Sequence, residues 1–252
     1  MNERFVFFSS LGYCMLASII IWEIAQRIFK ERSAVIGYCT VCLVISFLYG
    51  FKTWDRNYAW KDNLTLFKTD VKLSKNSIKC NTSYGGKLSE HANTIKDTEE
   101  RTKLIKESIS HLHKAITLYP GHTAITSWNL MGKSYAQIKN WGKARWAFKT
   151  CLKINPNYPE AKQNMEYIGQ QSYVYKNYNN SIIIYKDLAQ INKHKKDIYY
   201  NKLGQIYGQH LNQIDSAIFF LNKAVNYNNK NVSALENIGV AYSVSGNFSV
   251  AL

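Results

Sequence analysis

The chain has 252 residues, 46% of them hydrophobic, with 13 glycines and only 3 prolines, which excludes collagen-like and Pro/Gly-rich disordered proteins. Five scattered cysteines are too few for a disulfide scaffold. Lysine and arginine number 32 against 17 aspartates and glutamates, a formal net charge of +15, yet residues 1–51 hold only 4 basic and 3 acidic side chains. Two physical environments are therefore expected in this chain.

The first 51 residues predict a transmembrane helical hairpin. Residues 5–22 and 34–51 are uncharged, and each run approaches the roughly 20 residues with which a helix spans a bilayer. A cleaved signal peptide is the alternative for the first run, but the opening Asn2-Glu3-Arg4 is neutral and no small-x-small cleavage site follows. A buried soluble helix is the alternative for the second run. Cys39 and Cys42 lie inside that run and, without a second pair, are interpreted as small apolar residues.

The basic residues give a weak prediction of topology. Three of them occupy the turn between the two runs and three follow the second run: Arg27, Lys30, Arg32, Lys52, Arg56 and Lys61. This near tie slightly favours a cytoplasmic turn, with the rest of the chain outside. Trp54, Tyr58 and Trp60 suit the headgroup layer.

Residues 52–77 predict a linker helix at the membrane interface. Asp62 can cap a helix, and Leu64, Phe67 and Val71 would give that helix one apolar stripe.

Residues 78–252 predict a repeat array. Glycines recur after an apolar or tyrosine residue at intervals of 47, 37, 35 and 35 residues, beginning at Gly85. A period near 34 is that of the tetratricopeptide repeat (TPR), a helix–turn–helix unit whose copies stack into a solenoid. We expect copies at 78–123, 125–158, 162–195 and 197–231 and a partial copy at 232–252. The first copy has about eleven extra residues, and Asp97 is expected to cap its second helix. The copy at 197–231 has one extra residue in its turn.

Several residues at repeat positions have an expected packing role. In the clearest copy, Trp128 and Tyr135 share one helix face with Gly132, which lets the partner helix approach closely. Pro156 then ends the second helix. The packing set is Trp128, Gly132, Tyr135, Ala144, Phe148, Pro156, Gly204, Tyr207, Ala217 and Gly239. The chain stops just after Ala251, inside an expected second helix, so we expect a fragment or a truncated reading frame.

The first helices of a TPR solenoid line a concave groove, and polar residues are expected there. With Ile125 as position one, positions five and nine face the groove. The peptide-groove candidates are Asn129, Lys133, Glu166, Gln170, Asn201 and Gln205, with Glu236 at the next position five. We expect them to contact an extended peptide or a partner helix, although solubility alone would also make these positions polar.

Other chemistry is not indicated by the sequence. It contains no catalytic motif, no cofactor motif and no complete metal-ligand set. Glu107 and His111 share a helix face, but no third ligand has helical spacing, so a solvated surface pair is favoured. The basic cluster at 193–196 is interpreted as an exposed turn, because no aromatic residues are interleaved with it. No nucleic-acid partner is expected, and the bilayer is the expected lipid partner.

The boundary between the apolar runs and the array resembles one protein family. The motifs that carry the resemblance are Asn2-Glu3-Arg4, Arg56-Asn57-x-x-Trp60-x-Asp62-Asn63-x-x-Leu66-Phe67, Asn76-Ser77 and Tyr84-Gly85. They are similar to the transmembrane-and-TPR proteins, which are polytopic glycosyltransferases of the GT-C type. These are protein O-mannosyltransferases in animals, with bacterial relatives.

The resemblance implies the last membrane helices and the repeats of such an enzyme, with the repeats in the periplasm or lumen. The acidic catalytic residues of that family precede the matched part, so no residue here inherits a catalytic role. The function expected is a membrane-anchored TPR module that binds a protein or peptide. An independent membrane-tethered scaffold and a basic lipid- or nucleic-acid-binding module are the alternatives.

Overall fold

The computed structural model describes residues 4–246, and every regular element in that part of the chain is helical. The prediction of an all-α fold is confirmed. The chain divides into two compact units, Met1–Leu66 and Phe67–Leu252, which are described separately. The expected second helix of the last copy, with Ala251, lies outside the described residues.

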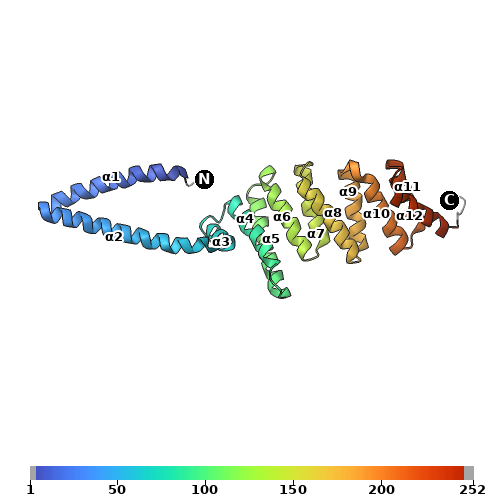
Figure 1. Cartoon of the computed structure of the whole chain (residues 1–252), viewed down its shortest axis with the longest axis horizontal. Helices are drawn as coiled ribbons and strands as arrows, with labels where there is room; N and C mark the ends of the chain where they lie inside the picture. Colours follow the sequence, from blue (N-terminus) through green and yellow to red (C-terminus); the bar gives the residue numbers. More distant parts are fainter. Residues whose placement is uncertain (1–3, 247–252) are drawn as a thin grey trace. The chain divides into compact units, whose positions relative to one another are not determined.

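The first unit is built on two long helices, α1 (Arg4–Ile28) and α2 (Glu31–Tyr58), that form a hairpin (Figure 1). The helices contact through the Tyr38 hydroxyl, 2.6 Å from Ser18 Oγ, and through an edge-on contact of Tyr38 with Trp22. α2 continues past residue 51, where the second apolar run was expected to end, as far as Tyr58. Both helices are long and apolar enough to cross a membrane.

A short helix, α3 (Asn63–Leu73), follows and includes the boundary between the units. Asp62 caps it, since Asp62 Oδ1 accepts a hydrogen bond of 2.7 Å from the backbone N–H of Thr65. Along the expected apolar stripe, Val71 is buried, whereas Leu64 and Phe67 are half-buried. The predicted cap at Asp62 is therefore present.

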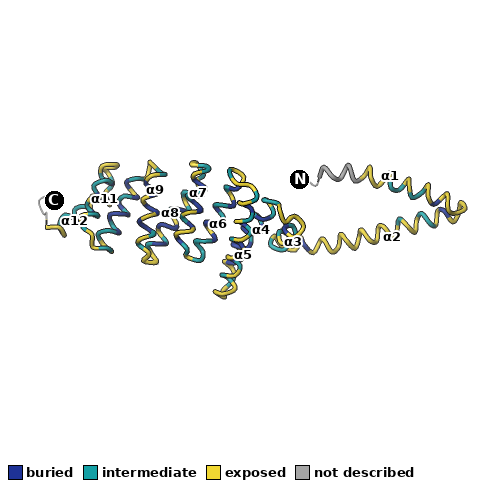
Figure 2. Tube along the Cα trace, turned by 180° about the vertical axis from the view of Figure 1, so that it is seen from behind, coloured by how far each residue is buried: buried dark blue, intermediate teal, exposed yellow. Residues whose placement is uncertain are grey.

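The second unit continues with nine helices in the described part of the chain, and each packs against its neighbours along the chain. They are α4 (Ile78–Ala92), α5 (Thr98–Leu118), α6 (Ile125–Gln137), α7 (Trp141–Ile154), α8 (Pro159–Val174), α9 (Tyr178–Ile191), α10 (Lys196–Gln205), α11 (Ile214–Tyr227) and α12 (Val232–Val244). The first helices α4, α6 and α8 also contact in succession, as do α10 and α12. Buried residues occur in each of these helices (Figure 2), and the largest buried cluster runs from Trp141 to Ile206.

Glycine allows close helix crossings within the repeats. A Cβ atom on Gly132 would lie 2.5 Å from the ring of Phe148, and one on Gly204 would lie 2.5 Å from Leu221. Phe148 is only 1% exposed, so its ring fills the space beside Gly132 completely. Of the other packing candidates, Ala144 and Ala217 are buried, and the larger rings are half-buried. Those half-buried rings belong to Trp128, Tyr135 and Tyr207, while Gly239 is half-buried and Pro156 is exposed.

The turns inside the repeats share a left-handed residue. Lys139, Lys176 and Asn212 have φ angles of 57°, 56° and 52°. In the first two turns the next residue is an asparagine that caps the second helix through its side chain. The extra residue of the copy at 197–231 is taken up by a π-helical turn at Ile206–His210 rather than by the turn itself.

Candidate functional site

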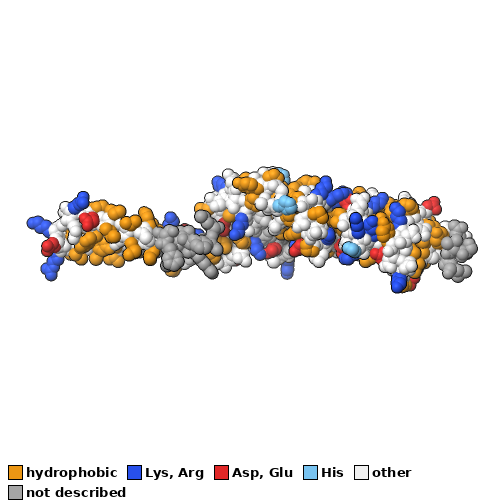
Figure 3. Space-filling model, turned by 90° about the horizontal axis from the view of Figure 1, so that it is seen from above, with side chains coloured by type: hydrophobic (Ala, Val, Ile, Leu, Met, Phe, Trp, Pro, Cys, Tyr) orange, Lys and Arg blue, Asp and Glu red, His pale blue; other side chains and the backbone are white. Residues whose placement is uncertain are grey.

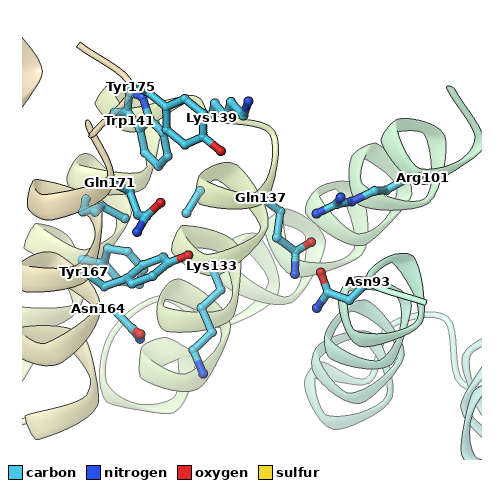
Figure 4. A pocket seen from close by; sticks show the side chains of 13 residues that line it. Asn93, Arg101, Lys133, Gln137, Lys139, Trp141, Asn164, Tyr167, Gln171 and Tyr175 are labelled. Atoms are coloured by element: carbon cyan, nitrogen blue, oxygen red, sulfur yellow. The ribbon is translucent and has the colours of Figure 1, made fainter. Parts of the chain in front are cut away.

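The candidate site is a pocket of about 620 Å³ in the second unit (Figure 4). Its lining comes from the residue after α4, the first turn of α5, the C-terminal half of α6 and the turn after it, α7, and α8. The lining residues are Asn93, Arg101, Lys133, Ala136, Gln137, Lys139, Trp141, Phe148, Asn164, Tyr167, Ile168, Gln171 and Tyr175. Most of them lie on first helices, the side on which a TPR solenoid presents its groove.

One wall of the pocket is built by the extra residues of the first copy. They lengthen α5 to 21 residues, and Figure 1 shows it reaching beyond the ends of its neighbours. Asp97 caps the lengthened helix, as predicted: Asp97 Oδ1 accepts a 2.7 Å hydrogen bond from the backbone N–H of Glu100. The insertion thereby supplies Asn93 and Arg101 to the pocket.

Two buried polar atoms, one on α5 and one at the end of α6, lack partners where these helices line the pocket. Arg101 Nε and Gln137 Oε1 are inaccessible to solvent, and neither is hydrogen-bonded within the described chain. Gln137 does use its other side-chain group, donating from Nε2 to the carbonyl of Ser89 at 3.2 Å. In Figure 4 the Arg101 side chain extends from α5 toward Gln137, with Asn93 beside them. Such groups are rare in native proteins, because each costs about 1–3 kcal/mol.

The charge of the lining is entirely positive. Arg101, Lys133 and Lys139 line the pocket, and no aspartate or glutamate does. Lys133 is exposed and makes no ion pair or hydrogen bond within the described chain. The ammonium of Lys139 lies 4.0 Å from the centre of the Tyr175 ring. The pocket therefore presents an uncompensated positive potential.

Aromatic rings form the opposite end of the pocket. Trp141 is buried and stacks on Tyr175 with 5.9 Å between ring centres. Tyr167, on α8, is 58% exposed and projects from the wall. A ring with an apolar body and a polar tip, exposed in a concavity, is a typical contact for a bound chain.

The predicted position-five residues are engaged between repeats. Asn129 Oδ1 accepts from Asn164 Nδ2 at 2.9 Å, and Asn201 Oδ1 accepts from Asn237 Nδ2 at 2.8 Å. Glu166 accepts from the Tyr199 hydroxyl and pairs with Lys195 at 3.1 Å. These side chains link each first helix to the next one.

The predicted position-nine residues differ in environment. Lys133 is exposed in the pocket, whereas Gln170 accepts from the Tyr185 hydroxyl at 3.3 Å and Gln205 accepts from Lys202 at 3.3 Å. Lys133 is the one peptide-groove candidate that lines this pocket. Glu236 is exposed on α12.

The side chains of Glu107 and His111, considered above as a metal-binding pair, are within hydrogen-bond distance of other residues of the chain. Glu107 accepts from the Tyr84 hydroxyl at 3.0 Å, and His111 Nδ1 lies 2.9 Å from Asn81 Oδ1. Burial lowers the pKa of His111. Within residues 4–246, no group of three or more His, Cys, Asp or Glu side chains is arranged to hold a metal ion.

The basic cluster at 193–196 is partly occupied by internal contacts. Lys195 pairs with Glu166, and Lys196 donates to the Tyr227 hydroxyl at 3.1 Å. The Lys196 ammonium also lies 4.7 Å from the Tyr227 ring centre. The aromatic partner that the local sequence lacks therefore comes from the end of α11.

Comparison with known proteins identifies the repeats. A tetratricopeptide-repeat family model matches residues 125–158 and 198–231. The chain is 27% identical over 138 residues to "Protein O-mannosyl-transferase TMTC1" of Mus musculus and 26% identical over 138 residues to the Homo sapiens protein of that name. A Drosophila melanogaster protein, "Protein O-mannosyl-transferase Tmtc1", is 29% identical over 75 residues. The mouse match spans 54% of this chain but only 13% of the mouse protein.

Two solved structures match the chain at low similarity. The crystal structure of MamA has a TM-score of 0.38 and 21% identity, covering 62% of this chain and 90% of that one. The crystal structure of YrrB, described as a TPR protein with an unusual peptide-binding site, has a TM-score of 0.41 and 14% identity, covering 74% and 87%. This chain is thus an all-helical tetratricopeptide-repeat protein with distant similarity, over about half its length, to the TMTC protein O-mannosyl-transferases.

Proposed function

We propose that the chain is a membrane-tethered TPR module that binds a peptide or protein segment in the pocket formed by α4, α5, α6 and α8. The pocket carries this proposal, because its exposed tyrosine, free lysine and unpartnered polar atoms lie on the groove side of the repeats. The buried asparagines at position five, Asn129 and Asn201, hydrogen-bond to the next repeat and do not line the pocket.

The tether consists of α1 and α2. Only 6% of each apolar window is buried, so these helices are unlike core helices of a soluble protein. Figure 3 shows hydrophobic side chains covering the visible part of the hairpin, with charged side chains gathered at its turn. An apolar surface of this extent is stable in lipid rather than in water.

The repeats are proposed to lie outside the cytoplasm, in the periplasm or lumen, as the family resemblance implies. The similarity to the mannosyl-transferases favours a second, finer proposal: the module serves a GT-C O-glycosyltransferase by holding its protein acceptor. An independent membrane scaffold would use the same pocket without an enzyme. Open reading frames upstream of Met1 that encode further apolar segments and an acidic loop would favour the enzyme over the scaffold.

Binding is tested with the full chain in zwitterionic lipid nanodiscs and three fluorescein-labelled twelve-residue peptides of acidic, neutral and basic composition. At least one peptide should bind, and Tyr167→Ala should weaken that binding. Tyr119→Ala is the control, because Tyr119 is also exposed but lies outside the pocket. Absence of binding by all three peptides, or equal weakening by both variants, would contradict the proposed function.

The tether is tested by extraction of native membranes. Sodium carbonate at alkaline pH should leave the chain in the membrane pellet, whereas a peripheral protein would be released. Full release would overturn the proposed tether without affecting the peptide-binding proposal.

A further inference from the structure

The insertion in the first repeat adds a positively charged side chain, Arg101, to the pocket. We propose that the pocket selects an acidic peptide segment, with Arg101 and Lys133 binding its carboxylates and the aromatic end binding a neighbouring apolar side chain. This inference rests on the proposed function and specifies its ligand class.

The charge of the pocket gives the first argument. Three cationic side chains line it and no carboxylate does, although the chain has 17 acidic residues. Two half-buried cations elsewhere in the array do have a carboxylate partner: Arg145 and Lys149 both pair with Asp187, at 2.5 and 2.7 Å. Arg101 and Lys133 have none within the described chain. A ligand carboxylate would supply the missing partner.

The two unpartnered atoms give a second, independent argument. Arg101 Nε is a donor and Gln137 Oε1 is an acceptor, and both are buried. An extended acidic peptide offers complementary groups, since its carboxylate accepts from a guanidinium and its backbone N–H donates to an amide oxygen. Because both atoms are shielded from solvent in the unliganded chain, such a peptide would reach them only after a shift of the Arg101 side chain.

The geometry of the lining gives the third argument. Arg101 and Gln137 lie at one end of the pocket, and Trp141 and Tyr175 gather at the other (Figure 4). Tyr167, on α8, is an exposed residue of the same lining. A single carboxylate cannot use both ends, whereas a peptide with an acidic residue near an apolar residue can.

Arg101, the residue proposed to select for acidic ligands, lies in the insertion of the first repeat. Arg101 and Asn93 belong to the lengthened connection between α4 and α5, which the other copies lack. The regular repeats supply the rest of the lining, including Lys133, Tyr167 and the aromatic end. The insertion therefore adds the guanidinium to a groove that the repeats already form.

The experiment compares two labelled probes on the full chain in zwitterionic nanodiscs. The acidic probe alternates Asp with Leu, Tyr and Ser, and the matched probe has Asn at each Asp position. Each is made with a free and an amidated C-terminus, which separates side-chain carboxylates from the terminal one. We expect the acidic probe to bind about tenfold more tightly, a difference of one charge-assisted contact.

Variants locate the selectivity. Arg101→Gln should weaken the acidic probe about tenfold and change binding of the Asn probe less than twofold. Lys103→Gln removes the same charge from the exposed side of α5, outside the pocket, and should leave both probes unchanged. Lys133→Gln provides a second test if Arg101→Gln unfolds, which circular dichroism would detect.

The outcomes separate this inference from the proposed function. Equal binding of the acidic and Asn probes would overturn the inference while the peptide-binding function stands. Equal losses in Arg101→Gln and Lys103→Gln would also overturn it, since they indicate a diffuse charge effect. Binding of an oligonucleotide or of phosphatidylserine vesicles, with no binding of either peptide, would overturn both.

Discussion

Replacing Gly132 by alanine tests the packing of the repeats most sharply. The added Cβ would lie 2.5 to 2.7 Å from three ring carbons of Phe148, far inside the normal contact distance. Phe148 is 1% exposed and packed on all sides, so the ring must shift against its neighbours. Overpacking of this kind costs about 1–3 kcal/mol. Alanine gains about 1 kcal/mol of helix propensity over glycine, which leaves a net loss of up to about 2 kcal/mol.

The control is the same substitution at Gly142. Its nearest neighbour would be Asn180 Oδ1 at 3.8 Å, an ordinary contact, and the position is exposed in the first turn of α7. Gly142→Ala should therefore be neutral or stabilising. The two variants have the same composition and differ only in what the new methyl group meets.

Thermal unfolding followed by circular dichroism measures the difference. A net loss of up to about 2 kcal/mol should lower the melting temperature of Gly132→Ala by up to about 8 °C, whereas Gly142→Ala should not lower it. The double variant Gly132→Ala with Phe148→Leu should be more stable than the two single effects added together, because the smaller side chain makes room for the methyl group. Equal melting temperatures for Gly132→Ala and Gly142→Ala would refute the close-crossing argument.

Three other predictions concern buried groups. Asp187→Asn should lower the free energy of unfolding in urea by about 1.5–3 kcal/mol, because Asp187 on α9 pairs with both Arg145 and Lys149 on α7. The control is Asp215→Asn at an exposed position, and an equal loss of stability in both variants would contradict this prediction. Burial raises the pKa of the Cys151 thiol to about 11, so in a variant whose other four cysteines are replaced by alanine Cys151 should react with Ellman's reagent at pH 8 only after unfolding; rapid reaction of that native variant would count against its burial. Burial also raises the pKa of Tyr84 and of Tyr185 to about 12. The unfolded chain therefore loses these protons at lower pH than the folded chain, so the free energy of unfolding should fall between pH 10 and pH 12. The fall should be smaller in Tyr185→Phe, and identical pH profiles for this variant and the parent would contradict the prediction.

The helical repeats are predictable from sequence because their information is local. Apolar residues at helical spacing define each face, and Gly132 precedes the small residue Ala144 by 12 residues, an interval that recurs at Gly169–Ser181 and is one residue longer at Gly204–Ala217. The period near 34 residues then predicts the stacking of helix pairs. The π-helical turn at Ile206–His210 is harder to predict from sequence, because spacing alone does not show whether an extra residue lies in the turn or in the helix.

The pocket is only partly predictable. Lys133 follows from its repeat position, but Arg101 and Asn93 lie in an insertion that has no repeat register, so sequence periodicity assigns them no face. The unusual length of that insertion is the signal that could have drawn attention to them. The partner of Asn129 at position five is not predictable for a related reason, because that partner is Asn164, a full repeat away.

The central claim, that a peptide lies in the pocket between the insertion and α8, is tested most directly by site-specific photocrosslinking. A benzophenone amino acid is placed at Tyr167, which is 58% exposed in the pocket, or at Tyr119, which is 60% exposed outside it. Irradiation with the acidic probe should yield an adduct at position 167 that an unlabelled acidic peptide competes away, and little adduct at position 119. Equal adducts at both positions, or an adduct at 119 alone, would contradict the account.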